Sequence, residues 1–419
     1  RDLHLGDIVS FGINSVVGTG IFFLPGEAAA MLGPAATLSF LIAAGLCSLL
    51  VLCFAEAGSR FRGTGGPILY AEAAFGPFAG FTVGWLMLCV RLVTWGALAN
   101  AVVTSLETLV PGAETYRTAI LVLHFTLLTA VNVSGVKWSA RVTNFFTLAK
   151  LLPMFVFAGV GLFFLDTSFF RPFAPHGYTR VGAGTLLLLF AFVGFEVLAV
   201  AAGEMKRPER DVPLGLFGSM GVITAIYLLI WVVCVGTLPT LAGSASPVAE
   251  AAPLFLGRLG GSFVAVGILM SVIGVNLAVS VVASRCLYAL ADDAHLPRYL
   301  ARVHAGTGAP VPAIVATAAL ALAISLSGTY VELAILSVVG RFAQFIPTCL
   351  AVLVLRRRDT EAPAFRIPLG ATVPVLALLL CAWLLSQAEA TQMFWGGVAI
   401  AAGGAIYLLG RRARPDRPA

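Results

Sequence analysis

Long apolar runs recur along the whole chain, and each is long enough to cross a membrane as a helix. A hydrocarbon core about 30 Å thick requires roughly 20 residues at the α-helical rise per residue. We predict about twelve spans, near residues 8–23, 35–58, 79–106, 117–134, 144–165, 183–202, 214–238, 262–290, 311–327, 332–355, 372–388 and 392–409. Hydrophobic residues make up 59% of the 419 residues, which excludes a water-soluble globular fold of this length. The short alternating segments of a β-barrel do not occur, so the sequence predicts an all-α integral membrane protein.

Basic residues predict the orientation of these spans. If the chain crosses the membrane at every predicted span, its loops alternate between the two sides of the membrane. Four of the 26 Lys and Arg residues then fall on one side, 19 fall on the opposite side, and three fall within spans. The four are Arg117, Arg171, Arg180 and Arg258, and the three are Arg91, Lys150 and Arg341. Because cytoplasmic loops carry the excess of Lys and Arg, both termini are expected in the cytoplasm, with the protein in the cell (inner or plasma) membrane. The net charge of +6 then reflects topology and anionic lipid headgroups, not nucleic acid.

Catalytic and metal sites have no support in the sequence. The seven cysteines lie inside apolar runs without paired spacing, and the five histidines are scattered. No metal-binding or nucleophile motif occurs. We therefore expect no cofactor, no metal and no enzymatic activity.

The first span is interrupted by Gly18, Thr19 and Gly20, in the stretch "NSVVGTGIFFLPG". A broken helix exposes backbone amides and carbonyls within the bilayer, where they are tolerated only if they line a cavity or meet a ligand. A half-helix beginning near Ile21 would point its positive end into that cavity. A carboxylate fits there, with the Thr19 hydroxyl and the amides of Gly18 and Gly20 as donors. The alternative is a small-residue surface for helix packing.

The sixth span carries a second interruption, "LLLLFAFVGFEVLAVAAGE", with Gly194 flanked by aromatic residues and Glu196 near mid-membrane. An acid at that depth is costly and indicates function. Broken helices at corresponding positions of two five-helix halves are typical of transporter binding sites.

Several stretches carry a family resemblance. They are "VVGTGIFFLPG", "FAEAGSRFRGTGGPILYAEAAFG", "NVSGVKWSARVTNFFTLAKLLP", "FVGFEVLAVAAGEMKRPERDVP", "YALADDAHLPRYLARVHAGTGAPVP" and "TCLAVLVLRRR". Together they resemble the amino acid/polyamine/organocation (APC) superfamily of transporters, in order from the first span to the tenth. The resemblance implies a LeuT-type fold: five helices in residues 1–170, an inverted repeat of five in 171–358, and two peripheral helices with a cytoplasmic tail in 359–419.

The resemblance also implies a site for an amino acid substrate. The α-carboxylate would bind Gly18, Thr19 and Gly20, and the amino group would meet carbonyls around Val16, Phe192, Val193 and Phe195. Phe190 falls where related antiporters carry a gating aromatic residue. Val279 falls where arginine-specific relatives carry a tryptophan.

A pocket of Phe190, Val193, Phe195, Asn276 and Val279 favours small or neutral amino acids, because its lining is mostly apolar. The alternative is a cationic amino acid or polyamine transporter or antiporter that uses Glu196.

Lys150, about two turns into the fifth span, is the candidate coupling residue. In several APC members a lysine of the fifth helix reaches the place where sodium-coupled relatives bind their cation. The resemblance therefore implies sodium-independent transport, with proton coupling through Lys150 as one version. In the alternative version, Lys150 stays protonated and has only a structural role, in which it binds carbonyls of the first helix from its place on the fifth.

Further charged residues are expected to support the structure. Arg91 and Arg341 lie within spans and need partners, for which the candidate acids are Glu56, Glu72, Glu196 and Glu332; a structural pair is favoured over substrate contact. Charged loops most simply satisfy topology, but in the family they also brace the inward gate. The expected gate residues are Glu204, Arg210, Arg285, Asp292 and Asp293.

The sequence therefore predicts a secondary transporter that works by alternating access. A ligand-gated channel would need a continuous polar pore, for which the spans are too uniformly apolar. Uniport, proton symport and exchange stay open, as do a monomeric and a homodimeric state.

Overall fold

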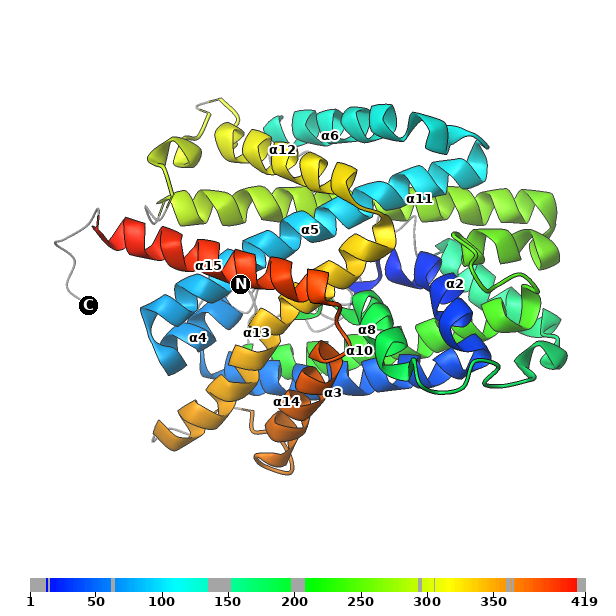
Figure 1. Cartoon of the computed structure of the whole chain (residues 1–419), viewed down its shortest axis with the longest axis horizontal. Coiled ribbons are helices and arrows are strands. Elements are labelled where there is room, and N and C mark those ends of the chain that lie inside the picture. Colours follow the sequence, from blue (N-terminus) through cyan, green and yellow to red (C-terminus); the bar gives the residue numbers. More distant parts are fainter. Residues whose placement is uncertain are drawn as a thin grey trace.

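The computed structural model describes residues 13, 16–61, 65–134, 152–196, 208–292, 296–304, 306–358, 363 and 365–412. Within these residues every regular element is a helix (Figure 1). The α-helices are α2 (Gly20–Leu32), α3 (Ala36–Arg60), α4 (Pro67–Phe75), α5 (Pro77–Leu109), α6 (Arg117–Val133), α8 (Val181–Phe192), α10 (Pro208–Thr237), α11 (Pro247–Asp292), α12 (Val311–Ser327), α13 (Tyr330–Arg358), α14 (Thr372–Leu385) and α15 (Ala390–Arg412). Short 3-10 turns lie at Gly33–Ala35, Ala113–Tyr116, Leu162–Phe164, Thr167–Phe170 and Arg298–Ala301.

Each predicted span overlaps a helix, the fifth one only from Leu152, where its description begins. Seven helical stretches in the described part of the chain are long and apolar enough to cross a membrane. Four shorter apolar helices accompany them. The protein is thus an all-helical, multi-pass membrane protein.

Three features of the helices depart from the predicted spans. The helix α2 continues to Leu32, beyond the predicted end of the first span at residue 23. The helix α11 begins at Pro247, ahead of the predicted eighth span, and is kinked at Gly257, whose φ is +69°. The helix α4 was not predicted, because its nine residues are too short to appear as an apolar run.

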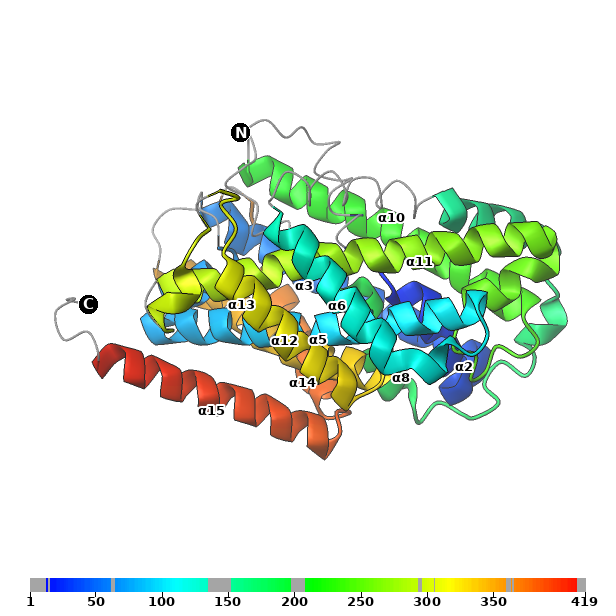
Figure 2. The same cartoon turned by 90° about the horizontal axis from the view of Figure 1, so that it is seen from above.

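The helices pack around α5, in which 83% of the most apolar 18-residue stretch is buried. It contacts α11, α12 and α13, while α3 packs against α8 and α10, and α2 packs against α8. One large hydrophobic cluster joins α2, α3, α8, α10, α13 and α14, and a smaller cluster joins α5, α6, α11 and α12. At the periphery, α15 lies along the edge of the bundle with only 6% of its most apolar window buried (Figure 2).

Candidate functional site at two helix breaks

The first helix is interrupted just before α2. The amide of Val17 donates to the carbonyl of Ile13 at 2.8 Å, after which Val17, Gly18 and Thr19 leave the helical path. The helix resumes at Gly20, one residue before the expected start, and the side chain of Thr19 caps none of its amides. The amide of Phe22 donates to the carbonyl of Thr19 at 3.0 Å. The amides of Gly20 and Ile21, which precede the first intrahelical bonds, are the donors that the start of α2 can offer to a ligand.

The second interruption follows α8. Its last helical bond joins the amide of Val193 to the carbonyl of Leu189 at 3.2 Å. Gly194 then takes a φ of +119°, which side chains disfavour, and the chain is helical again at Glu196. Glycine at this position therefore permits the break.

The start of α2 and the end of α8 cross closely. A Cβ atom on Gly20 would lie 2.6 Å from the Cα of Ala191, so only glycine fits at the crossing. The positive end of one helix dipole therefore lies beside the negative end of another. Next to them, a Cβ on Gly18 would find its nearest neighbour, the Val16 carbonyl oxygen, at 3.7 Å. This geometry suits a small molecule that carries an anionic and a cationic group.

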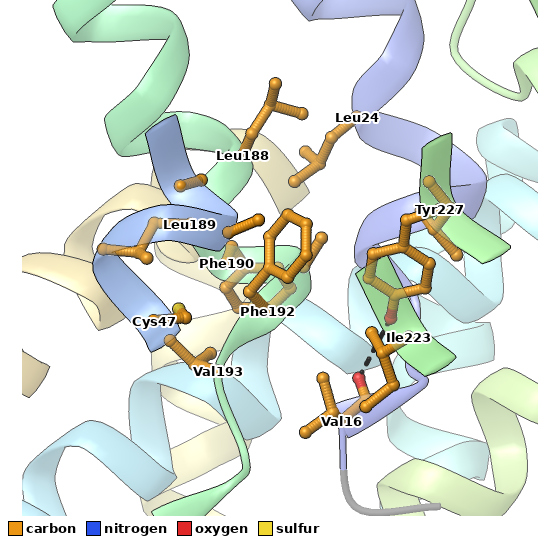
Figure 3. Packing of buried hydrophobic residues seen from close by; sticks show 14 of the residues in the cluster. Val16, Leu24, Cys47, Leu188, Leu189, Phe190, Phe192, Val193, Ile223 and Tyr227 are labelled. Carbon is orange, nitrogen blue, oxygen red and sulfur yellow. Dashed lines mark hydrogen bonds between the residues drawn. The ribbon is translucent and has the colours of Figure 1, made fainter. Parts of the chain in front are cut away.

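Two tyrosines from other helices hold the first break. The Tyr227 hydroxyl of α10 donates to the carbonyl of Val16 at 3.2 Å (Figure 3), and it also interacts with the backbone of Gly18. The Tyr330 hydroxyl of α13 donates to Oγ1 of Thr19 at 3.0 Å. Neither residue was predicted from the sequence. The available signal was a tyrosine within an apolar run, since a buried phenol needs a hydrogen-bond partner.

The aromatic residues expected at the site gather around these tyrosines. Phe190 packs edge-on against Tyr330 with ring centroids 6.0 Å apart, and Phe192 packs against Tyr227 at 5.2 Å. Val193 lies close to Phe192 (Figure 3). Phe195 continues the row by stacking on Phe345 at 5.9 Å. All four predicted residues are buried in the large cluster with Val16.

Asn276 and Val279 have different neighbours. The Asn276 amide donates to the carbonyls of Leu98 on α5 and Val272, each at 2.9 Å. Val279 packs against the smaller cluster around α5 and α6. The contacts found for these two residues are thus with α5 and its neighbours, and they are separate from the aromatic group around the breaks.

A buried ion pair braces the second break. The guanidinium of Arg341 on α13 donates to Oε1 of Glu196, and the amide of Gly194 donates to Oε2 at 2.9 Å. Arg341 also donates to Oγ1 of Thr94 at 3.4 Å. Glu196 is 2% exposed and Arg341 is 8% exposed, so each charge depends on the other. Of the candidate acids, Glu196 is therefore the partner of Arg341, whereas Nε of Arg91 is buried without a hydrogen-bond partner in the part of the chain that the structure describes.

Another candidate acid, Glu56, forms a second buried pair at the far end of α13. Its oxygens accept from Nε of Arg356 at 2.6 Å and from the amide of Ile367 at 2.8 Å. Arg60 lies 3.9 Å from the same carboxylate. Through these contacts Glu56 joins α3 to α13 and to the segment before α14.

The remaining charged candidates are less constrained. Lys150, Glu204 and Asp293 lie outside the described residues. Arg210, Arg285 and Asp292 are exposed, and no ion pair joins them to another described residue.

A cavity of about 520 Å³ lies on the predicted outer side of the breaks. Its lining includes Phe23, Glu27, Asn100, Glu107, Arg117 and Tyr330. Because Tyr330 also contacts Thr19, this residue lies between the cavity and the first break.

Apolar spanning helices with two helix breaks beside one another are typical of membrane transport proteins. Residues 3–407 match the model of the amino acid permease family, and the chain belongs to this family of permeases. It is 30% identical to the branched-chain amino acid permease BcaP of Bacillus subtilis over 92% of this chain and 87% of that protein. It is 28% identical to the serine/threonine exchanger SteT of B. subtilis, covering 96% and 94%, and 28% identical to the methylthioribose transporter of B. subtilis, covering 98% and 93%.

Proposed function

We propose that the protein is a secondary active transporter of amino acids that works by alternating access. The crossing of Gly20 with Ala191 carries this proposal, because it sets the uncapped start of α2 beside the end of α8. A zwitterionic amino acid would bind there with its carboxylate at Gly18, Thr19 and Gly20 and its ammonium group at carbonyls near Phe192 and Val16.

The proposed substrates are small or neutral amino acids. Branched-chain amino acids and serine or threonine are named for two relatives, BcaP and SteT. The Glu196 carboxylate is already engaged by Arg341 and by the amide of Gly194, which leaves it little capacity for a cationic side chain. A cationic amino acid or polyamine transporter is the second candidate, and it would require Glu196 to leave Arg341.

The proposed transport cycle needs no covalent chemistry. The amino acid enters from the cavity above Tyr330, binds between the two breaks, and leaves on the opposite side when the helices that carry the breaks tilt against the rest. In this proposal residues 1–170 and 171–358 form inverted repeats within a twelve-helix, LeuT-type architecture, residues 359–419 are peripheral, and both termini face the cytoplasm of a cell membrane.

Lys150 remains the proposed coupling residue. An ammonium group reaching the first helix would replace a sodium ion, so transport would be sodium-independent and either proton-coupled or exchanging. Replacing Lys150 by Ala should abolish or uncouple uptake, and unchanged uptake at every pH would contradict this role.

The test is uptake of labelled alanine into proteoliposomes without sodium, with and without an inward proton gradient. Each unlabelled amino acid and methylthioribose then compete in turn. We expect saturable uptake blocked by small neutral amino acids. Dependence on sodium would overturn the Lys150 proposal, competition by arginine and lysine alone would favour the cationic candidate, and competition by methylthioribose alone would overturn amino acid transport.

Counterflow separates a carrier from a channel. Proteoliposomes preloaded with unlabelled alanine should transiently accumulate labelled alanine above its external concentration. Flux that neither saturates nor shows counterflow would indicate a channel.

A further inference from the structure

We infer that Tyr330 is a positioning residue for the substrate carboxylate, acting through the hydroxyl of Thr19. This inference rests on the proposed function and extends it, since it assigns to α13 a part in the binding of the carboxylate at the first break.

In the hydrogen bond between the two residues, Tyr330 is the donor and Oγ1 of Thr19 is the acceptor, at 3.0 Å. A threonine hydroxyl has one proton to donate and two lone pairs that accept. With one lone pair occupied by Tyr330, the Thr19 proton is available to another acceptor. Thr19 is only 1% exposed, and its hydroxyl donates to none of the described residues. A bound carboxylate can supply the acceptor that a buried donor needs.

We place that acceptor beside Gly18, where a Cβ atom would have only the Val16 carbonyl oxygen within 4 Å among the described residues, at 3.7 Å. A carboxylate oxygen placed there completes a chain in which Tyr330 donates to Thr19 and Thr19 donates to the anion. Successive hydrogen bonds of this kind polarise one another, so each strengthens the next. The Tyr330 hydroxyl therefore increases the affinity for the carboxylate without touching it.

The ring of Tyr330 fixes the position of its hydroxyl. It packs between Phe23, at a centroid distance of 5.4 Å, and Phe190, at 6.0 Å. The same residue lines the outer cavity and is 8% exposed. By contrast, Tyr227 donates to a backbone carbonyl, which has no proton to pass on.

A double-mutant cycle tests the inference. Binding of labelled alanine to the purified protein is measured for the wild type, Tyr330→Phe, Thr19→Ala and the double variant. If another amino acid from the uptake panel binds more tightly, it replaces alanine. We expect Tyr330→Phe to raise the dissociation constant about tenfold, the size of one hydrogen bond near a charge. In the Thr19→Ala background the same change should have an effect within about twofold, because the group through which it acts is gone.

Two further variants serve as controls. Thr19→Ser keeps the hydroxyl, so Tyr330→Phe should again weaken binding about tenfold in that background. Tyr70→Phe removes the hydroxyl of another buried tyrosine, which packs between Phe54 and Phe61, and should leave binding unchanged. A monodisperse elution profile and an unchanged melting temperature establish that each variant is folded.

Additive effects of Tyr330→Phe and Thr19→Ala, or wild-type binding by Tyr330→Phe, would overturn the inference and leave the proposed function intact. A wild-type protein that binds no amino acid would overturn the proposed function and the inference together.

Discussion

The two helix breaks are held in different ways. At the first, neutral hydrogen bonds from Tyr227 and Tyr330 reach across from other helices, and the side chain of Thr19 caps none of the amides at the start of α2. At the second, Glu196 bonds the amide of Gly194 and pairs with Arg341. The first break is therefore free to bind a ligand, whereas the polar groups of the second are already engaged by Glu196 and its ion pair with Arg341.

This difference suggests that the two breaks have different roles in the site. Neutral hydrogen bonds contribute modestly and can exchange for a ligand, but a buried charge left without its partner is strongly destabilising. We accordingly expect substitutions at the second break to act mainly on folding and those at the first to act mainly on affinity.

The largest effect is expected from Arg341→Ala. It leaves the Glu196 carboxylate buried without its counterion, which should lower the free energy of unfolding by about 3–5 kcal/mol. Denaturant or thermal unfolding in detergent measures this loss. The double variant Glu196→Gln with Arg341→Gln removes both charges and should recover part of it. Wild-type stability of Arg341→Ala would show that the pair does not brace the break.

Gly20→Ala should follow. Its Cβ would lie 2.6 Å from the Cα of Ala191, so the two helix ends must separate, at a cost of about 1–3 kcal/mol. Uptake should be lost or strongly reduced, because the opposed helix ends no longer meet. Gly18→Ala is the matched control, since its Cβ would make only an ordinary contact, at 3.7 Å from the Val16 carbonyl oxygen. That variant should fold like the wild type but bind alanine more weakly, and equal behaviour of both variants would argue against the crossing as the site.

The sequence predicted the two interruptions but not what holds them. Glycine within an apolar run, next to Thr19 in the first span and two residues before Glu196 in the sixth, is a local signal, and the structure has the breaks at residues 17–19 and 193–195. A function was likewise predicted for Glu196, because an acid near the middle of a membrane span is costly. Its partner Arg341 is 145 positions away, and no local pattern encodes a contact between two helices so distant in sequence.

The same limit explains the other omissions. Tyr227 and Tyr330 became part of the site only once α10 and α13 were packed against the first break. For Asn276 and Val279, the contacts found are with the helices around α5, and their place in the substrate pocket stays a prediction. Periodicity and composition define which segments are helical, but the rotation of α11 about its axis depends on its neighbours.

Tyr227→Phe is expected to have a smaller effect. It removes one neutral hydrogen bond to the Val16 carbonyl, worth about 0.5–1.5 kcal/mol, and leaves the ring packed against Phe192. The Michaelis constant for alanine uptake should rise severalfold, with little change in melting temperature. A large loss of stability with unchanged affinity would place Tyr227 among the bracing residues instead.

The smallest effects should come from Arg210→Ala and Arg285→Ala. Both residues are exposed and form no ion pair with a described residue, so each change should alter stability by no more than about 0.5 kcal/mol. Melting temperature and uptake rate check this. Uncoupled or strongly slowed uptake would instead support their expected role in the inward gate.

A structure determined with saturating alanine shows most directly whether the substrate binds between the two breaks. We expect density for the amino acid between α2 and α8, with its carboxylate about 3 Å from the Thr19 hydroxyl and from the amides at the start of α2. Alanine bound only in the outer cavity beside Tyr330, or oriented with its ammonium group toward Thr19, would contradict binding of the carboxylate at the first break.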